Sequence, residues 1–250
     1  MKRLEFATCT HQGRVRRNNE DAVGSLDHLG VLIVADGMGG CQAGEVASHM
    51  AVDLVLSHLV QHLTPELAAS GVMIHLKSAL MAANEAIYER SLVDLQLHGM
   101  GTTAVVAAFG LAHLAFAHVG DSRLYRLRNG QLECLTRDHT VIQELIDRDE
   151  FPGMREALAA GVNPNVLTRA LGSEGLLQSD LGVTPCQIDD LYLLCTDGLT
   201  GMVAEPDISA VLAEPIALAG RAERLVAAAC ARGGVDNVTV ALAHVSSISD

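Results

Sequence analysis

The chain contains the stretch Val31-Leu32-Ile33-Val34-Ala35-Asp36-Gly37-Met38-Gly39-Gly40, in which an apolar run ends in an aspartate and a glycine-rich turn. An unbroken apolar run of this length predicts a buried strand. A carboxylate at the end of such a strand can serve as a metal ligand. Because aspartate also terminates strands as a simple turn former, this residue alone does not establish a metal site.

Two more aspartates adjoin strongly apolar runs. Asp197 follows the run 191–195, and Asp236 precedes the run 238–242. Three carboxylates at the ends of apolar strands favour one shared cation site over three unrelated turns. Carboxylate, carbonyl and water oxygens suit hard cations such as Mg²⁺ or Mn²⁺, whereas zinc prefers His or Cys. Gly37 lacks a side chain, so its own carbonyl can approach the ion that Asp36 holds.

Composition limits the other classes of function. At 250 residues with 49% hydrophobic residues, the chain can form one sizeable core, and we expect a single domain over residues 1–250. The net charge of −13 argues against a nucleic-acid surface. The longest apolar stretch, 102–119, is interrupted by Gly110, His113 and His118 and is a poor membrane span.

We therefore expect a soluble cytoplasmic protein that binds neither membrane nor nucleic acid. The start of the chain lacks the apolar core of a signal peptide. The cysteines are scattered without a C-x-x-C pair, which is typical of reduced, structural thiols. They are Cys9, Cys41, Cys134, Cys186, Cys195 and Cys230.

Hydrophobic periodicity predicts the elements. Apolar residues at three- and four-residue spacing indicate helices over 47–59 and 76–87, and later near 207–212 and 222–229. His49, His58 and His62 lie along the first helix and are interpreted as surface or capping residues. The predicted strands are 4–10, 31–35, 103–109, 114–119, 124–127, 131–135, 181–183, 191–195 and 238–243.

The segment 138–164 interrupts this rhythm. It combines a short helical pattern over 141–146 with Pro152, Gly153, Gly161 and Pro164. Long irregular segments of this kind are commonly functional loops. We interpret this one as a mobile flap inserted between strands.

The glycine turn does not match two nucleotide-binding motifs. A dinucleotide fingerprint requires glycine at the position of Gln42, and a Walker loop requires lysine after Gly44, where Glu45 stands. A tyrosine-phosphatase loop is also missing, because no cysteine begins a C-x-x-x-x-x-R string.

Eight short motifs, in order along essentially the whole chain, carry a family resemblance. They are Gly13-Arg14-Val15-Arg16-Arg17-Asn18-Asn19-Glu20-Asp21, Ala35-Asp36-Gly37-Met38-Gly39-Gly40, Gly101-Thr102-Thr103, Gly120-Asp121-Ser122-Arg123, Leu135-Thr136-Arg137-Asp138-His139, Leu167-Thr168-Arg169-Ala170-Leu171-Gly172, Thr196-Asp197-Gly198 and Asp236-Asn237-Val238-Thr239. Together they resemble the bacterial branch of the metal-dependent type 2C protein phosphatases, the PPM family.

The resemblance implies an α+β fold in which two mainly antiparallel sheets form a sandwich flanked by helices on both sides. It also implies a two-metal centre at one end of that sandwich. By this resemblance Asp36 bridges both ions, Asp197 and Asp236 complete the first, and the Gly37 carbonyl holds the second. The waters of the second ion are oriented by Glu20 and Asp21. Asp121 matches a position that, with Asp197, holds a weaker third ion.

Arg16 matches the family's substrate-phosphate arginine. A guanidinium suits this task because its planar donors meet two phosphate oxygens at once. Without the motif, Arg16 could equally be a surface residue paired with Glu20 or Asp21. Met38 stands where eukaryotic relatives have a histidine proposed as general acid, so that role is unassigned and a metal-bound water is the candidate.

The expected activity is hydrolysis of phosphoserine and phosphothreonine in proteins, dependent on Mn²⁺ or Mg²⁺ and opposed to a bacterial Ser/Thr kinase. Two cations roughly 3.5–4 Å apart lower the pKa of a bridging water, and the resulting hydroxide attacks phosphorus in line. We expect a monomer. One alternative is a catalytically silent regulatory relative that binds a phosphoprotein, although all three central aspartates are present. Another is a phosphatase dedicated to one anti-sigma-type antagonist.

Overall fold

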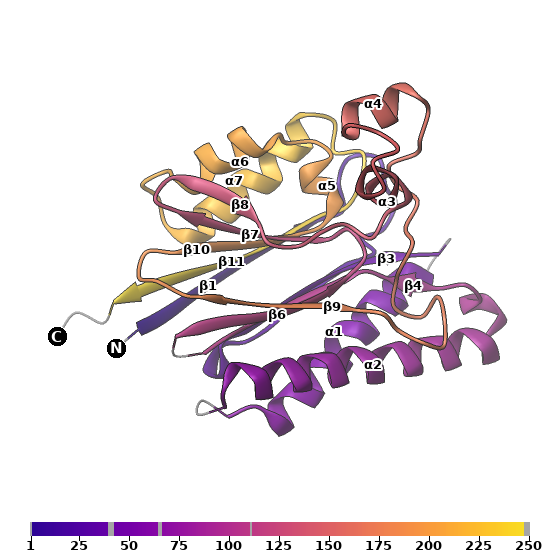
Figure 1. Cartoon of the computed structure of the whole chain (residues 1–250), viewed down its shortest axis with the longest axis horizontal. Helices are drawn as coiled ribbons and strands as arrows, with labels where there is room; N and C mark the ends of the chain where they lie inside the picture. Colours follow the sequence, from indigo (N-terminus) through magenta and orange to yellow (C-terminus); the bar gives the residue numbers. More distant parts are fainter. Residues whose placement is uncertain (1, 40–42, 65–66, 111, 248–250) are drawn as a thin grey trace.

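The computed structural model describes residues 2–39, 43–64, 67–110 and 112–247. Its strands form two antiparallel sheets packed face to face (Figure 1). Gly40 of the glycine-turn motif lies outside the described residues, as do Cys41 and Gln42. The expected sandwich fold is confirmed.

The first sheet has the strand order β1-β11-β10-β7-β8. Its strands are β1 (Lys2–His11), β11 (Val238–Ser247), β10 (Leu191–Cys195), β7 (Arg123–Arg128) and β8 (Gln131–Cys134). The second has the order β2-β3-β5-β6-β9, with β4 paired to β3. Its strands are β2 (Asp21–Leu26), β3 (Val31–Met38), β4 (Gly101–Thr102), β5 (Ala104–Phe109), β6 (His113–Val119) and β9 (Asp180–Pro185).

Helices cover the outer face of each sheet (Figure 1). α1 (Ala43–His62) and α2 (Ala69–Val93) pack on the second sheet. α5 (Asp197–Thr200), α6 (Glu205–Leu212) and α7 (Leu218–Ala231) pack on the first. Short 3-10 turns occupy Asp27–Leu29 and Leu95–Leu97. The order of layers is therefore helix, sheet, sheet, helix.

This order explains why β3 is apolar along its length. Side chains alternate across a strand, so Val31, Ile33 and Ala35 face α1 and α2, while Leu32 and Val34 face the other sheet. Both faces are buried, and an alternating polar pattern would leave unpaired polar groups in one of the two cores.

The segment 138–164 contains α3 (Val141–Asp147) and α4 (Met154–Ala159). These helices lie at the end of the sandwich opposite the chain termini (Figure 1). The segment is closed at its base because the Val141 amide donates to the Val166 carbonyl at 2.9 Å and Thr140 bridges to Leu167. A mobile flap stays a prediction, whereas its short helix is confirmed.

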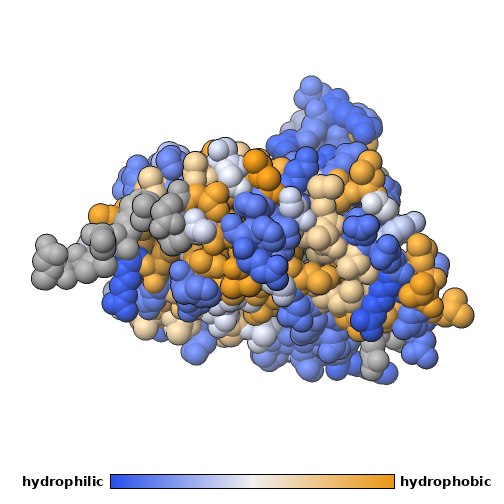
Figure 2. Space-filling model, turned by 90° about the horizontal axis from the view of Figure 1, so that it is seen from below, coloured by the Kyte–Doolittle hydropathy of each residue, from blue (hydrophilic) through white to orange (hydrophobic). Residues whose placement is uncertain are grey.

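The outer surface of the α1–α2 layer is mixed in character. Seen from below, hydrophobic residues stand among hydrophilic ones (Figure 2), and Ile74 and Met81 of α2 are exposed. In the described part of the chain, no helix is both long and apolar enough to cross a membrane. The five described cysteines are free thiols.

Candidate metal centre

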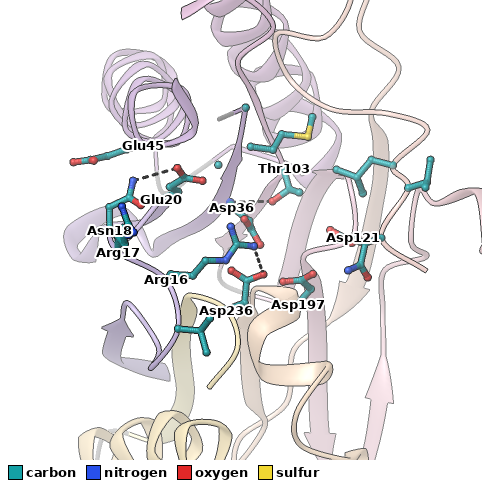
Figure 3. A pocket seen from close by; sticks show the side chains of 17 residues that line it. Arg16, Arg17, Asn18, Glu20, Asp36, Glu45, Thr103, Asp121, Asp197 and Asp236 are labelled. Atoms are coloured by element: carbon teal, nitrogen blue, oxygen red, sulfur yellow. Dashed lines mark hydrogen bonds and ion pairs between the residues drawn. The ribbon is translucent and has the colours of Figure 1, made fainter. Parts of the chain in front are cut away.

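An acidic cleft of about 1070 Å³ opens at the end of the sandwich where β3 ends and α5 begins. Most of the expected site residues line it: Arg16, Glu20, Asp36, Gly37, Met38, Asp121, Asp197 and Asp236. The side chains of Asp36, Asp197 and Asp236 project toward one another, with Arg16 beside Asp236 (Figure 3). The structure thus brings together carboxylates that are up to 200 residues apart in the sequence.

Asp36 is fixed at its backbone by two threonines. Its carbonyl accepts hydrogen bonds from the Thr103 amide at 2.9 Å and from the Thr102 hydroxyl at 2.9 Å. Its own amide donates to Thr103 Oγ1 at 3.0 Å. Thr103 Oγ1 in turn lies 2.7 Å from Ser122 Oγ, so the turn that carries Asp121 is linked to the strand that carries Asp36.

Gly37 is required by the close approach of three chain segments. A Cβ atom added there would lie 2.1 Å from the Gly44 carbonyl oxygen and 2.6 Å from the Glu20 carbonyl oxygen. The Gly37 amide also donates to the Glu20 carbonyl at 3.1 Å. Any side chain would push α1 and the Glu20 loop away from the cleft.

Asn237 anchors the N-terminal loop to the strand that starts at Asp236. Its side-chain amide donates to the carbonyls of Gln12 and Asn18, each at 2.9 Å, and its Oδ1 accepts from the Glu20 amide at 2.8 Å. The Asn237 amide donates to Asp236 Oδ1 at 2.8 Å. This one side chain therefore holds the loop with Arg16 and Glu20 against the cleft.

Asp21 lies behind the cleft rather than in its lining. It pairs with Asp36 across the β2–β3 ladder and is 3% exposed. Its Oδ2 accepts from the Thr196 hydroxyl at 3.0 Å, whereas its buried Oδ1 has no hydrogen-bond partner in the described structure. An unsatisfied buried carboxylate oxygen, in a side chain that also experiences the charges of Asp197 and Asp236, fits a neighbouring cation.

Arg16 has a partner that sequence analysis did not name. Its Nη2 donates to Asp236 Oδ2 at 2.7 Å, and both side chains are partly exposed. The alternative interpretation, a surface pairing with Glu20 or Asp21, does not describe the direct contact, because Asp236 accepts from the guanidinium instead. Arg16 therefore stands at the edge of the cleft, next to the carboxylates.

The carboxylates strongly disfavour one another's ionisation. Burial, and then Asp21, Asp197 and Asp121, raise the pKa of Asp36 well above its usual range. Burial raises the pKa of Asp121 to about 7, with Asp197 and Asp138 adding to it. Burial, followed by Asp236, also raises the pKa of Asp197. Only a cation can make full ionisation of this group favourable at neutral pH.

The turn that carries Asp121 is held in place by hydrogen bonds and an ion pair of neighbouring residues, to which sequence analysis assigned no role. Arg123 makes a bidentate contact with Asp138 at 2.8 and 2.7 Å. The Gly120 amide donates to His139 Nδ1 at 3.1 Å, and the His139 amide donates to the Gly120 carbonyl at 3.0 Å. The only sequence signal for these roles was membership of the quoted motifs.

Of the described residues that line the cleft, none is a histidine. Met38 is part of the lining, as its place in the glycine turn indicated. His139 is 5% exposed and is committed to Gly120, so it cannot protonate a leaving group in the cleft. The general acid is therefore unassigned among the side chains.

We expect the metal-free protein to lose thermal stability as pH rises from 5 to 8. The pKa of Asp21 and of Asp121 is about 7 in the folded chain against about 4 when unfolded. Between these values the folded state binds more protons, so stability falls with rising pH by ~1.4 kcal/mol per pH unit for each such proton. This corresponds to roughly 3–6 °C per pH unit for a chain of this size.

Thermal unfolding in chelated buffer at several pH values checks this expectation. The variant Asp121→Asn should show a weaker dependence, because one of the titrating groups is removed. A melting temperature that is constant or rises over this range would contradict the inferred ionisation.

Comparison with known proteins gives a consistent result. The family model for protein phosphatase 2C matches residues 10–229. The serine/threonine phosphatase stp of Listeria monocytogenes is 40% identical over 236 residues, which is 93% of this chain and 92% of the relative. The crystal structure of the Mycobacterium tuberculosis serine/threonine phosphatase PstP/Ppp is 36% identical and superposes with a TM-score of 0.88, covering 98% of this chain and 99% of that one.

A second solved structure is described as the catalytic domain of PstP in complex with two manganese ions. It is 34% identical, has a TM-score of 0.85, and covers 99% of this chain and all of that chain.

Proposed function

The chain belongs to the protein phosphatase 2C family and is a metal-dependent serine/threonine protein phosphatase, and we propose on this basis that its acidic cleft is the catalytic metal centre. The observation that carries the proposal is the convergence of Asp36, Asp197 and Asp236, all lining one cleft. Because all three aspartates are present, an active enzyme is favoured over a silent binding relative.

The residues present fit two divalent cations such as Mn²⁺ or Mg²⁺. Carboxylates dominate the polar lining of the cleft, its described residues include no histidine or cysteine, and Arg16 is the one cation in ion-pair contact with Asp236 among the described residues. The unpartnered Asp21 oxygen and the raised pKa values indicate negative charge without compensation. Hard divalent ions are the natural partners of such a group.

We assign the ligands as follows. Asp36 would hold both ions, Asp197 and Asp236 would complete one site, and the Gly37 carbonyl would contribute to the other. Glu20, from the cleft lining, and Asp21, from behind it, orient water around the second ion. Asp121, beside Asp197, is the ligand for a weaker third ion, and its raised pKa supports this.

When bound, the two ions would supply a nucleophile for phosphate-ester hydrolysis at neutral pH by lowering the pKa of water. The protein's own side chains position the metal-binding carboxylate and the phosphate-binding arginine. Thr102 and Thr103 hold the Asp36 carboxylate in place through its backbone, and Asn237 holds the loop that carries Arg16. Arg16 binds the substrate phosphate with its planar donors, exchanging its contact with Asp236 for the phosphate oxygens.

Arg16→Ala is expected to raise KM for phosphorylated substrates about 10- to 100-fold, the size of one or two charge-assisted hydrogen bonds, with a smaller loss in kcat. The reason is that Arg16 contacts phosphate similarly in the ground and transition states. Steady-state kinetics on an aryl phosphate and a phosphopeptide measures both constants.

Arg16→Lys is the matched control, because it keeps the charge and loses the two-pronged geometry. It should fall between the parent and Arg16→Ala in KM. Equal losses in kcat and kcat/KM would instead place Arg16 in transition-state stabilisation.

We also propose that the segment with α3 and α4 selects protein substrates without taking part in the chemistry. Its closing residues adjoin Asn165, Val166 and Leu167, which line the cleft. A phosphoprotein that reaches the cleft from this side would contact α3 or α4, whereas a small phosphate ester would not. Mobile segments near a site commonly act in this way.

Exchanging residues 141–164 for the corresponding stretch of a related phosphatase should change rates on phosphopeptides and leave aryl-phosphate turnover within a few fold. Asp138 and His139 are kept in this exchange, because they support the Asp121 turn. An inert surface loop predicts no change on either substrate. Loss of both activities in a folded variant would show that the segment supplies part of the catalytic centre.

Phosphorylated proteins follow as substrates from the family. We propose further that the enzyme opposes a cognate Ser/Thr kinase, acts in the cytoplasm and is monomeric. Restriction to a single anti-sigma-type antagonist is the alternative, and phosphoproteomics of a deletion strain distinguishes it from a broad enzyme.

A further inference from the structure

Three histidines gather on the outer side of the α1–α2 layer, away from the acidic cleft. His58 and His62 stand one turn apart on α1, and His75 comes from α2. One potential ligand atom from each lies within 4.8 Å of the other two. The ring centroids of His58 and His62 are 4.3 Å apart, and those of His62 and His75 are 5.2 Å apart.

The first two residues have the spacing H-x-x-x-H, which sequence analysis did not recognise as a ligand pair. Residues at i and i+4 project side by side from one helix face, and this spacing supplies two metal ligands in known helical zinc sites. The third histidine comes from the neighbouring helix, so only the fold reveals it. The interpretation of His58 and His62 as separate surface or capping residues is therefore incomplete.

The hydrogen bonds leave lone pairs available. His62 Nδ1 lies 2.7 Å from the His58 carbonyl. A carbonyl only accepts, so Nδ1 carries the proton and Nε2 keeps its lone pair, as in metal-binding imidazoles oriented by a backbone carbonyl. His58 Nε2 is buried and has no hydrogen-bond partner in the described structure.

Protonation of all three imidazole rings together is also unfavourable. Burial, and then the neighbouring His62 and His75, lower the pKa of His58. Within the described ranges, none of the three rings forms an ion pair with a carboxylate. Neutral imidazoles that face one another without a proton donor or an acid lack an evident stabilising partner.

We propose that His58, His62 and His75 form a second metal site, for a nitrogen-preferring divalent ion such as Zn²⁺, which joins α1 to α2. Zinc binds imidazole at about 2.0–2.1 Å, which places tetrahedral ligand atoms about 3.3 Å apart. Small side-chain rotations close the present spacing to this value. Because His62 is exposed, water can supply a fourth ligand. Mn²⁺ and Mg²⁺ prefer oxygen and are disfavoured here.

A second histidine group shows why this one is distinctive. His118, His139 and Asp180 are equally close together. However, His139 Nδ1 accepts from the Gly120 amide, so its Nε2 carries a proton directed at Asp180, 3.3 Å away. The Arg169 guanidinium also lies 3.0 Å from Asp180 and repels a cation. His118 Nδ1 is unpartnered there, but the other two members are engaged with Gly120 and Arg169, so that group lacks a complete free ligand set.

The proposed site is remote from the reaction. α1 begins at Ala43, beside the glycine turn, and rises 1.5 Å per residue, so His58 is about 22 Å further along the helix. An ion there crosslinks the two helices that cover the second sheet. It should stabilise the fold by binding only the native state, and leave catalytic turnover unchanged.

Calorimetric titration with Zn²⁺, in buffer with saturating Mg²⁺, tests the proposal. The parent should bind one Zn²⁺ at micromolar or lower concentration and gain thermal stability. His62→Ala on α1 and His75→Ala on α2 should each weaken this binding at least about tenfold, since each removes a ligand. They should also lose the gain in melting temperature.

His49→Ala is the matched control. His49 is on the same helix, is exposed, and has the same Nδ1 contact to a carbonyl four residues earlier, at 2.9 Å. This variant should bind Zn²⁺ as the parent does. Asp36→Asn should also retain the binding, which separates this site from the acidic cleft. Equal Zn²⁺ affinity in the parent, His62→Ala and His75→Ala, or binding only at millimolar concentration, would overturn the proposal.

Discussion

Asp36→Asn is expected to lower kcat by at least about 10³-fold on both aryl phosphates and phosphopeptides. The assigned bridge between the two ions loses its charge, which weakens both ions and the acidity of the water they share. Single-turnover kinetics at saturating Mn²⁺ measures the remaining chemical step. Asp121→Asn is the matched control, because it alters a carboxylate of the same cleft and should leave the first two ions bound.

Asp36→Asn should also raise the melting temperature of the metal-free protein. Burial and four neighbouring carboxylates disfavour the charged form of Asp36, so a neutral amide of similar shape relieves repulsion. Lost activity together with gained stability excludes misfolding as the cause of inactivity. If calorimetry shows that Asp36→Asn binds Mn²⁺ as tightly as the parent, the assignment of the bridge is wrong.

Removal of divalent ions should abolish turnover of an aryl phosphate, and added Mn²⁺ or Mg²⁺ should restore it. The cleft carries carboxylates and two arginines, and its described lining residues include no histidine or cysteine, so neither a thiolate nor an imidazole is present there to act as nucleophile. Restored ions should also stabilise the protein, by about 2.7 kcal/mol when their concentration is 100 times Kd.

Dialysis against chelator, followed by a titration of each ion, measures both the restored turnover and the gain in stability on one sample. Addition of Zn²⁺ to His62→Ala and to the parent separates the catalytic ions from an ion at the histidine group. Persistent turnover in metal-free buffer would contradict a metal-dependent reaction.

Much of the fold was predictable because strands that are buried on both faces consist of long apolar runs. The strands β3, β5, β6, β10 and β11 were recognised for this reason. β2 was missed, because Gly24 and Ser25 interrupt its pattern. Gly24 faces α1, where a Cβ would lie 2.7 Å from side chains of Val52 and Leu56, so packing against the helix determines this strand more than its propensity does.

The acidic residues of the site were predictable, whereas the groups that position them were not. An aspartate beside an apolar run is recognisable locally in the sequence, and the motifs indicated the remaining site residues. The hydroxyls of Thr103 and Thr196 act through contacts between residues 67 and 175 positions apart. His75 likewise approaches His58 and His62 only because α1 and α2 pack side by side. Such pairs follow from the topology and have no periodic signal in the sequence.

The central claim is that Asp36 bridges two ions in the acidic cleft. Anomalous diffraction at the manganese absorption edge, from crystals equilibrated with Mn²⁺, locates the ions directly. The account predicts two strong peaks, each within about 2.5 Å of a carboxylate oxygen of Asp36, with Asp197 and Asp236 at one of them. A single ion, or two ions that Asp36 does not contact, would contradict it.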